Sequence, residues 1–278
     1  MAINNNLVDV NSIKEVATSA VNNATTNIYV GDHTDMSGNN GTIINNSTVT
    51  GDVTNVTTVD NSVVIIKEGD TYTYNGGDKV ITNYQQGEKV MLASDYQGIR
   101  LDGKSSFVNS SSGSLEIQDS HDKFVEYTVD DGGEGETVAY SYVAGTEGTI
   151  DGSDKAEAEI LIGADNADNE IIAGDGSASL WGGNGGADTL TGGEGNDEFF
   201  YAIGSGNDVV QNANSNDVIN LLGISLEQIS NVDVNIGQVN INFIDGGNLT
   251  VEGNSGAGFK LGEEVYTVNQ STKEWSTK

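Results

Sequence analysis

The sequence predicts an all-β protein organised around a parallel β-roll, or β-solenoid, with flanking β-strand units and one short N-terminal helix. Three observations lead to this fold class. Gly- and Asp-rich nonapeptides follow one another in the C-terminal half, and alternating Thr, Val and Asn residues typical of short strands fill much of the N-terminal half. The chain also has 37 glycines but no proline and no cysteine, so its turns depend on glycine and asparagine and it forms no disulfides.

Composition divides the chain into four segments. Ser12 and Glu15 have the spacing of a capping box and are followed by apolar residues at helical intervals, which predicts a short helix near the start. Strand-like runs follow, and then acidic, glycine-rich repeats. The expected domains are an N-terminal segment with the helix (1–26), a Thr/Asn/Gly-rich β domain with a degenerate repeat unit (27–150), a β-roll (151–222) and a C-terminal β cap (223–278).

An internal repeat links the two halves of the chain. Residues 74–92 align without gaps on residues 203–221, with matching apolar residues at several positions. Further along, GSLEIQD at 113–119 resembles GNLTVEG at 247–253. The chain is therefore expected to contain two related β-units.

The chain is strongly acidic, with 42 Asp and Glu against 11 Lys and Arg and a net charge of −31. This charge argues against nucleic acid and against an anionic membrane surface as partners. No stretch approaches about 20 consecutive apolar residues, so no membrane insertion is expected, and the N-terminus lacks the pattern of a cleaved signal peptide. Divalent cations are the expected partners, because clustered carboxylates repel one another until a cation binds among them.

One nonapeptide pattern recurs in the C-terminal half. Residues 192–200, GGEGNDEFF, fit the pattern G-G-x-G-x-D-x-U-x, where U is a large apolar residue. Related units lie at 164–172, 173–181, 182–191, 203–211 and 212–220. The unit at 182–191 is one residue longer, and the two units before it carry Asn169 and Ala178 where aspartate is expected. Six units in tandem are far more specific than a single glycine-rich loop.

The spacing predicts how these units fold. Each nonapeptide supplies a turn of about six residues and a strand of about three, so two units complete one coil of a parallel roll. Glycine allows each turn to aim its carbonyl groups inward, and the aspartate at the sixth position faces the same groove. Two stacked turns can supply the roughly six to eight oxygen ligands that calcium takes. The apolar residues expected in the narrow core are Leu180, Leu190, Phe199, Val210 and Ile219.

The repeats resemble the RTX, or hemolysin-type, calcium-binding repeat over residues 164–220, and more loosely over 221–278. The resemblance implies Ca²⁺ as the cofactor. The side-chain ligands that it implies are Asp188, Asp197, Asp208 and Asp217. The carbonyl ligands that it implies lie in the neighbouring turns, at Gly183, Asn184, Gly185, Gly193, Gly195, Gly204 and Gly206. Proteins of this family leave the cell through type I secretion systems, directed by an uncleaved C-terminal signal, and fold when they meet calcium outside.

The earlier copy of the internal repeat departs from this pattern. It carries Lys79 and Glu88 where the later copy carries aspartates. Because the positive charge of Lys79 would oppose a cation, residues 74–92 are expected to form strands without bound metal.

No enzymatic site is evident, and the chain is expected not to be an enzyme. Both histidines, His33 and His121, lie in polar sequences typical of solvated turns. The serine-hydrolase elbow, the zinc-protease helix motif and phosphate-binding loops are all missing from the sequence. A β-helical polysaccharide lyase would need calcium and a basic residue, and Arg100 is the only arginine. Several aromatic residues could form either a sugar-stacking face or caps on the core. They are Tyr72, Tyr74, Trp181, Tyr201 and Trp275.

These observations predict a secreted structural protein of the cell surface or extracellular space, folded and stiffened by calcium. Self-association into a homopolymer, as in a filament, matrix or surface layer, is expected because open parallel coils can template another copy. Residues 1–66 are the segment expected to join subunits. The alternatives are an adhesin that binds a cell-surface or glycan ligand and, least favoured, a polysaccharide-acting enzyme.

Overall fold

The computed structural model describes residues 69–278 except 93–95, 131–134, 254–255 and 270. Upstream of residue 69 it describes the backbone of six short strands and the burial of Val64 and Ile66. The predicted helix near Ser12 lies outside the described residues.

The regular secondary structure of the described residues is almost entirely β-strand. They contain no α-helix, and the one helical element is a single 3₁₀ turn, Leu226–Gln228. No helix in the described part of the chain is long and apolar enough to cross a membrane. The chain forms two compact units, Met1–Thr137 (unit 1) and Val138–Lys278 (unit 2). The domain boundaries expected from composition remain predictions.

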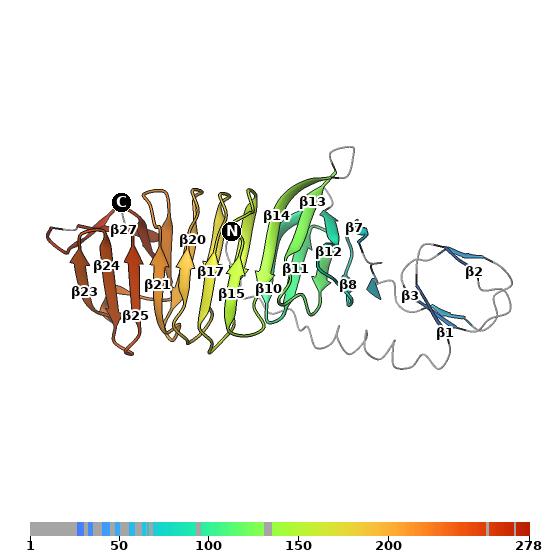
Figure 1. Cartoon of the computed structure of the whole chain (residues 1–278), viewed down its shortest axis with the longest axis horizontal. Helices are drawn as coiled ribbons and strands as arrows, with labels where there is room; N and C mark the ends of the chain where they lie inside the picture. The colour runs from blue at the N-terminus through green and yellow to red at the C-terminus, as the bar shows by residue number, and fades with distance from the viewer. Residues whose placement is uncertain are drawn as a thin grey trace. The chain divides into compact units, whose positions relative to one another are not determined.

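Unit 2 is built from two rows of parallel strands, between which the chain alternates. Row A contains β15 (Gly148–Asp151), β17 (Asn169–Ile172), β19 (Thr189–Thr191), β21 (Asn207–Gln211) and β25 (Asn248–Glu252). Row B contains β14 (Glu136–Val143), β16 (Ala158–Ile162), β18 (Ala178–Trp181), β20 (Glu198–Ala202), β22 (Val218–Leu222) and β26 (Gly258–Leu261). The strands of row A lie side by side in Figure 1. This arrangement is all-β, rich in parallel pairs and consistent with the predicted roll.

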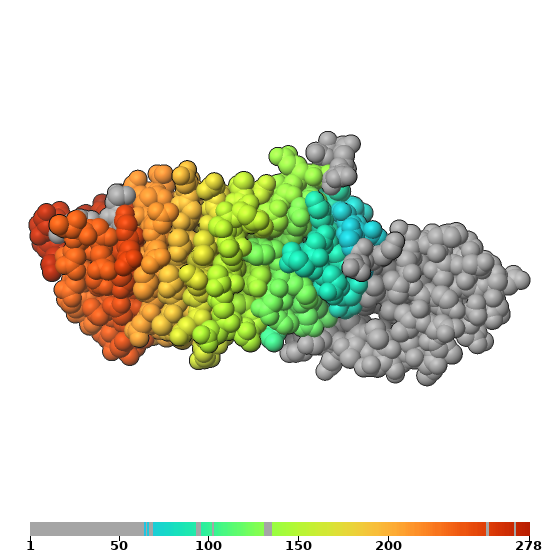
Figure 2. Space-filling model, in the orientation of Figure 1, coloured from blue at the N-terminus to red at the C-terminus, as the bar shows by residue number. Residues whose placement is uncertain are grey.

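Each coil of unit 2 is slightly longer than two nonapeptides. Leu180 pairs with Phe199, and Phe199 pairs with Ile219, so aligned residues are 19 and 20 positions apart. The additional residue in the unit at 182–191 and the insertion of Tyr201 and Ala202 account for these lengths. Successive coils form adjacent bands on the molecular surface, which run from yellow to orange in Figure 2.

The core of unit 2 consists of the apolar residues predicted from the repeat. These residues, all at most 1% exposed, are Leu180, Leu190, Phe199, Val210 and Ile219. Their burial confirms the prediction from the recurring apolar position. Because each lies in the middle of a strand, the polar turns are left at the two edges of the rows.

Antiparallel strands close the C-terminal end of both rows. In row A, β23 (Ile229–Asn235) and β24 (Gln238–Phe243) form a hairpin that pairs with β25. In row B, β27 (Glu264–Val268) and β28 (Trp275–Thr277) add to β26. Tyr201 stacks on Phe243 with ring centroids 4.8 Å apart, and Trp275 meets Phe259 edge to face at 5.3 Å. Tyr201 and Trp275 therefore pack against the core, as one of the two interpretations of the aromatic residues proposed.

Unit 1 repeats this plan. Its strands are β6 (Val63–Val64), β7 (Thr71–Tyr74), β8 (Lys79–Ile81), β9 (Lys89–Leu92), β10 (Tyr96–Asp102), β11 (Ser105–Ser110), β12 (Gly113–Ile117) and β13 (Val125–Val129). β8 pairs in parallel with β12, β9 with β13, and the hairpin of β10 and β11 joins β12. In unit 2, β21 and β22 correspond to β8 and β9, and β25 and β26 correspond to β12 and β13. The hairpin of β23 and β24 corresponds to the hairpin of β10 and β11.

The register of the two units agrees with the repeat in the sequence. Val80 pairs with Glu116 in unit 1, and the aligned residues Val209 and Thr250 pair in unit 2. The segments that resemble each other in sequence thus occupy equivalent strands. Before β6, the backbone forms two small parallel sheets from β1 (Asn27–Val30), β3 (Gly41–Ile44) and β5 (Val56–Thr58), and from β2 (His33–Asp35) and β4 (Thr48–Thr50).

Candidate metal centre

The turns of unit 2 stack along its two edges. Turn stack A consists of the turns that lead into row A, at 163–168, 182–188 and 203–206. Turn stack B consists of the turns that lead into row B, at 152–157, 173–177, 192–197 and 212–217. Consecutive repeat units therefore contribute to opposite edges, and units one coil apart meet in the same stack.

The structure sorts the four predicted aspartates into two pairs. Asp188 and Asp208 lie at the ends of their turns in stack A. Asn169 has the equivalent position one coil earlier. Asp197 and Asp217 occupy the same place in stack B. All four are buried, with at most 2% of the residue exposed. Alternate aspartates are thus brought together, and neighbours in the repeat are separated.

Each aspartate bonds to the backbone of the preceding coil through one carboxylate oxygen. In stack A, the Asn169 N–H donates to Asp188 Oδ1 at 2.8 Å, and the Asp188 N–H donates to Asp208 Oδ1 at 3.1 Å. In stack B, the Ala178 N–H donates to Asp197 Oδ1 at 2.9 Å, and the Asp197 N–H donates to Asp217 Oδ1 at 3.0 Å. The carboxylates therefore tie successive coils together at the start of each strand.

The second oxygen of two aspartates points into its own turn. Asp188 Oδ2 and Asp197 Oδ2 are buried and accept no hydrogen bond of normal geometry from any described residue, although the Gly193 N–H lies close enough to the Asp197 carboxylate to lower its pKa. A Cβ at Gly182 would lie 2.1 Å from Asp188 Oδ2, and a Cβ at Gly192 would lie 2.6 Å from Asp197 Oδ2. Glycine at the first position of each turn thus makes room for the carboxylate. A buried charge without a partner is costly, so each oxygen requires a proton or a cation.

The electrostatics of the stacks agree with this requirement. Burial raises the pKa of Asp188 and of Asp197 from 3.8 to about 6, although the backbone N–H bonds oppose the shift. Burial raises the pKa of Asp208 to about 7, and the neighbouring charge of Asp188 adds to this. The pKa of Asp217 is also raised by burial. The aspartates hold protons more tightly than solvated carboxylates, unless a cation stabilises their charge.

All the predicted carbonyl ligands lie in the two turn stacks. Stack A contains Gly183, Asn184, Gly185, Gly204 and Gly206, and stack B contains Gly193 and Gly195. Several of them are glycine because adjacent turns nearly touch: a Cβ at Gly193 would lie 1.7 Å from the Gly174 carbonyl oxygen. The carbonyl groups of Asn184 and Gly204 already accept backbone N–H bonds, from Asn166 and Gly185, both at 2.7 Å.

Side chains alone do not complete a metal site in the described part of the chain. No group of three or more His, Asp or Glu side chains there converges closely enough to hold an ion. A cation in the turn stacks would therefore have to combine carboxylate oxygens with backbone carbonyl oxygens. That donor set consists only of oxygen, which calcium prefers.

In stack A, the coil before Asp188 has Asn169 at the position of the aspartate. Its side-chain amide donates to the carbonyl oxygens of Thr146 at 3.0 Å and Gly148 at 3.2 Å, while its Oδ1 accepts the Ala164 N–H at 2.8 Å. The amide supplies its own donors, so this coil needs no cation. The substitution of asparagine for aspartate seen in the sequence therefore has a structural reason.

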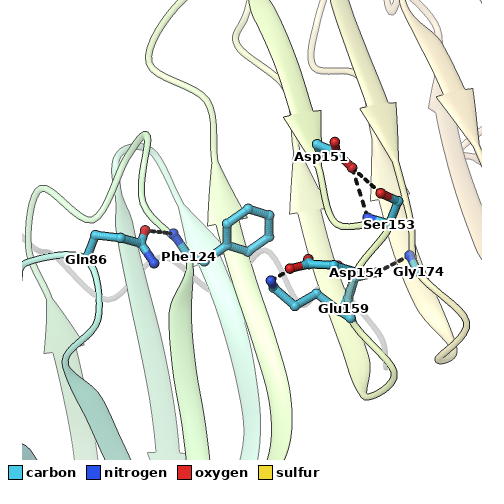
Figure 3. Close-up of polar contacts among 8 residues, drawn as sticks. Gln86, Phe124, Asp151, Ser153, Asp154, Glu159 and Gly174 are labelled. Atoms are coloured by element: carbon cyan, nitrogen blue, oxygen red, sulfur yellow. Dashed lines mark hydrogen bonds and ion pairs between the residues drawn. The ribbon is translucent and has the colours of Figure 1, made fainter.

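Turn stack B contains a further buried carboxylate, Glu159, which the nonapeptide pattern did not predict. It pairs with Ala178 across row B, so it occupies the place of an aspartate one coil earlier in stack B. It is 2% exposed and its Oε2 accepts the Gly174 N–H at 2.7 Å (Figure 3). Counting back 19 residues from Ala178, a coil length visible only in the structure, would have found it.

Both histidines belong to unit 1. His121 lies in the turn after β12 of unit 1. The backbone of His33 lies in β2, and its side chain is outside the description.

No protein-family model and no curated protein matches this chain. Among solved structures, the crystal structure of the extracellular lipase LipA from Serratia marcescens is similar over 77% of this chain, with a TM-score of 0.35 and 13% sequence identity. The match covers 43% of the lipase chain, so this chain spans less than half of that protein. A similarity of this degree carries no conclusion about activity.

Proposed function

We propose that this chain is a secreted, non-enzymatic structural protein whose turn stacks bind calcium outside the cell. One observation carries the proposal: buried carboxylate oxygens of Asp188 and Asp197 lie inside glycine turns without a hydrogen bond of normal geometry to any described residue. Protons satisfy these oxygens only at low pH, whereas a divalent cation satisfies them at neutral pH.

The donor set supports calcium rather than a softer metal. The turn stacks offer carboxylate and carbonyl oxygens, and the chain has no cysteine. Calcium accepts such ligands in a flexible geometry, while zinc prefers sulfur and imidazole nitrogen. The net charge of −31 also opposes compaction until cations bind. The resemblance to the RTX repeat supports export to a compartment with abundant calcium.

The proposal includes self-association. Antiparallel strands cover the last parallel strands of unit 2, so the edge strands at its C-terminal end are β23 and β28. Ile236 and Ile244, in the turns on either side of β24, are 102% and 66% exposed. Exposed apolar residues beside an edge strand support contact with another copy through strand pairing.

Electron microscopy and thermal unfolding of the purified chain, in calcium and in EDTA, test the proposal. We expect a higher melting temperature and ordered polymers in calcium. Identical unfolding curves in the two buffers would reject calcium binding. A raised melting temperature with monomers only would reject self-association, and specific hits on a glycan array would then favour the adhesin alternative.

A further inference from the structure

The geometry points to an additional calcium site at the N-terminal end of turn stack B, held by Glu159 in place of the carboxylate missing at Ala178. This inference rests on the proposed calcium binding of the stacks. It assigns a ligand that lies outside the recognisable nonapeptides, which begin at residue 164.

Glu159 has the same relation to its turn as the predicted ligands. Its Oε1 is buried and accepts no hydrogen bond of normal geometry from any described residue, as with Asp197 Oδ2. A Cβ at Gly152 would lie 1.9 Å from Glu159 Oε1, just as a Cβ at Gly192 would meet Asp197 Oδ2. Gly152 thus leaves room for a carboxylate in this turn.

The intervening coil lacks both parts of this arrangement. The residue that corresponds to Asp197 is Ala178, and the residue that corresponds to Gly192 is Ala173. Both alanines are buried. The carboxylate of the turn at 173–177, Asp175, is exposed, so this turn contributes no buried carboxylate. The buried carboxylate one coil earlier in stack B is Glu159.

The length of the turn suits glutamate. Gly152 and Glu159 are seven positions apart, whereas Gly192 and Asp197 are five positions apart. In the longer turn, the additional methylene group of glutamate brings the carboxylate to the interior. Figure 3 shows the Glu159 side chain directed at Gly174 of the next coil.

Backbone oxygens of the same turn face Gly174. If Gly174 had a Cβ, that atom would lie 1.9 Å from the Lys155 carbonyl oxygen and 2.7 Å from the Gly152 carbonyl oxygen. The Gly174 N–H itself donates to Glu159 Oε2. One carboxylate and two carbonyl groups thus gather where this turn meets the next, and these are the oxygen types that bind calcium.

A cation at this place would be held only when Glu159 is ionised. Burial, with smaller contributions from the charges of Asp197 and Asp154, raises the pKa of Glu159 to about 7, although the Gly174 N–H and Lys155 oppose the shift. The Lys155 ammonium group is paired with the Asp154 carboxylate and lies 5.2 Å from the centre of the Tyr140 ring. An alternative role for Glu159 is therefore purely structural, as a counter-charge to Lys155.

Calcium stoichiometry of the full chain, measured by isothermal titration and equilibrium dialysis, tests the inference. Glu159→Gln keeps the size of the side chain and its acceptor for the Gly174 N–H. We expect this variant to bind one calcium ion fewer than the wild type. Glu170→Gln makes the same charge change at an exposed residue in β17, the next strand, and should bind as many ions as the wild type.

Thermal unfolding separates a ligand from a structural counter-charge. If Glu159 binds calcium, Glu159→Gln lowers the melting temperature in calcium but not in EDTA, because the substitution removes a buried charge. Equal losses in both buffers would assign Glu159 a purely structural role and overturn the inference. A second variant, Gly152→Ala, fills the space beside Oε1 and should lose the same ion with Glu159 intact.

The outcomes also distinguish this inference from the function on which it rests. If the wild type binds no calcium, the proposed function fails. If the wild type binds calcium and both Glu159→Gln and Gly152→Ala bind the same number of ions with the same affinity, the inference about Glu159 alone is overturned.

Discussion

The two copies of the internal repeat share a topology but differ in the residues at their turns. Asp208 and Asp217 of unit 2 correspond to Lys79 and Glu88 of unit 1. Glu88 keeps part of the local geometry, since its Oε2 accepts the Gln85 N–H at 2.7 Å, as Asp217 Oδ2 accepts the N–H of Asn214 at 2.7 Å. The strand pairing is therefore compatible with lysine at a position where unit 2 has aspartate.

Unit 1 has buried tyrosines in addition to two buried carboxylates, Glu88 and Glu116. Three tyrosines are completely or almost completely buried in it, Tyr74, Tyr84 and Tyr127. The Tyr84 hydroxyl donates to the Glu88 carbonyl oxygen at 2.7 Å, and the Tyr74 hydroxyl donates to the Gly77 carbonyl oxygen at 2.9 Å. These two hydroxyl groups of unit 1 thus bond within the chain. The paired strands do not require the aspartates, and a ligand is the role that we propose for them.

Removal of calcium should give the largest difference between the units. Chelation leaves the buried carboxylates of unit 2 without counter-charge, so we expect amide hydrogen exchange in β18, β20 and β22 to accelerate by about tenfold or more. Exchange in β8 and β12 of unit 1 should change little. Both tryptophans, Trp181 and Trp275, lie in unit 2, so tryptophan emission should shift to longer wavelength. Equal acceleration in both units would contradict the comparison.

Removal of one aspartate from each turn stack should give a smaller effect of the same kind. We expect Asp197→Ala with Asp208→Ala to lower the melting temperature in calcium by about 5 °C or more, because each stack loses a proposed ligand. In EDTA the loss should shrink or reverse, since two buried charges disappear. Glu194→Gln alters an exposed carboxylate in the same turn as Asp197 and serves as the control. A loss that is equal in calcium and EDTA would assign the aspartates to backbone hydrogen bonding alone.

The sequence predicted the features that recur with a fixed period. The apolar residue of each nonapeptide identified core positions such as Leu180 and Phe199, and the alternation of units between two edges followed from two units per coil. The repeat between 74–92 and 203–221 also predicted equivalent strands. These features depend on local patterns that every coil repeats.

Features that depend on the length of individual turns could not be predicted. Glu159 lies in β16, after a turn that has only Gly152 of the nonapeptide glycines, and its alignment with Ala178 requires the coil length of 19 residues. The connection of 223–247 also gave no sign that β23 and β24 would form a hairpin on β25. Such pairings join residues whose separation in sequence is not set by the repeat.

The pH dependence of stability sharpens the comparison further, with a smaller expected effect. Burial raises the pKa of Asp188 and Asp197 to about 6 and of Asp208 to about 7, against 3.8 for the same group when solvated. Between about pH 4 and 7 the folded chain therefore binds more protons than the unfolded chain, and stability falls as pH rises through this range. The chain in EDTA should melt at a higher temperature at pH 5 than at pH 8.

Calcium should weaken or reverse this dependence, because it neutralises the same carboxylates at high pH and is displaced by protons at low pH. The general repulsion among 42 acidic residues acts in the same direction as the buried aspartates, so a variant must separate the two. Asp197→Asn with Asp208→Asn removes only the buried groups and should flatten the pH profile in EDTA. A melting temperature in EDTA that rises from pH 5 to pH 8 would mean that these carboxylates are ionised and satisfied by the protein itself. In that case the difference between the two units would not concern a ligand.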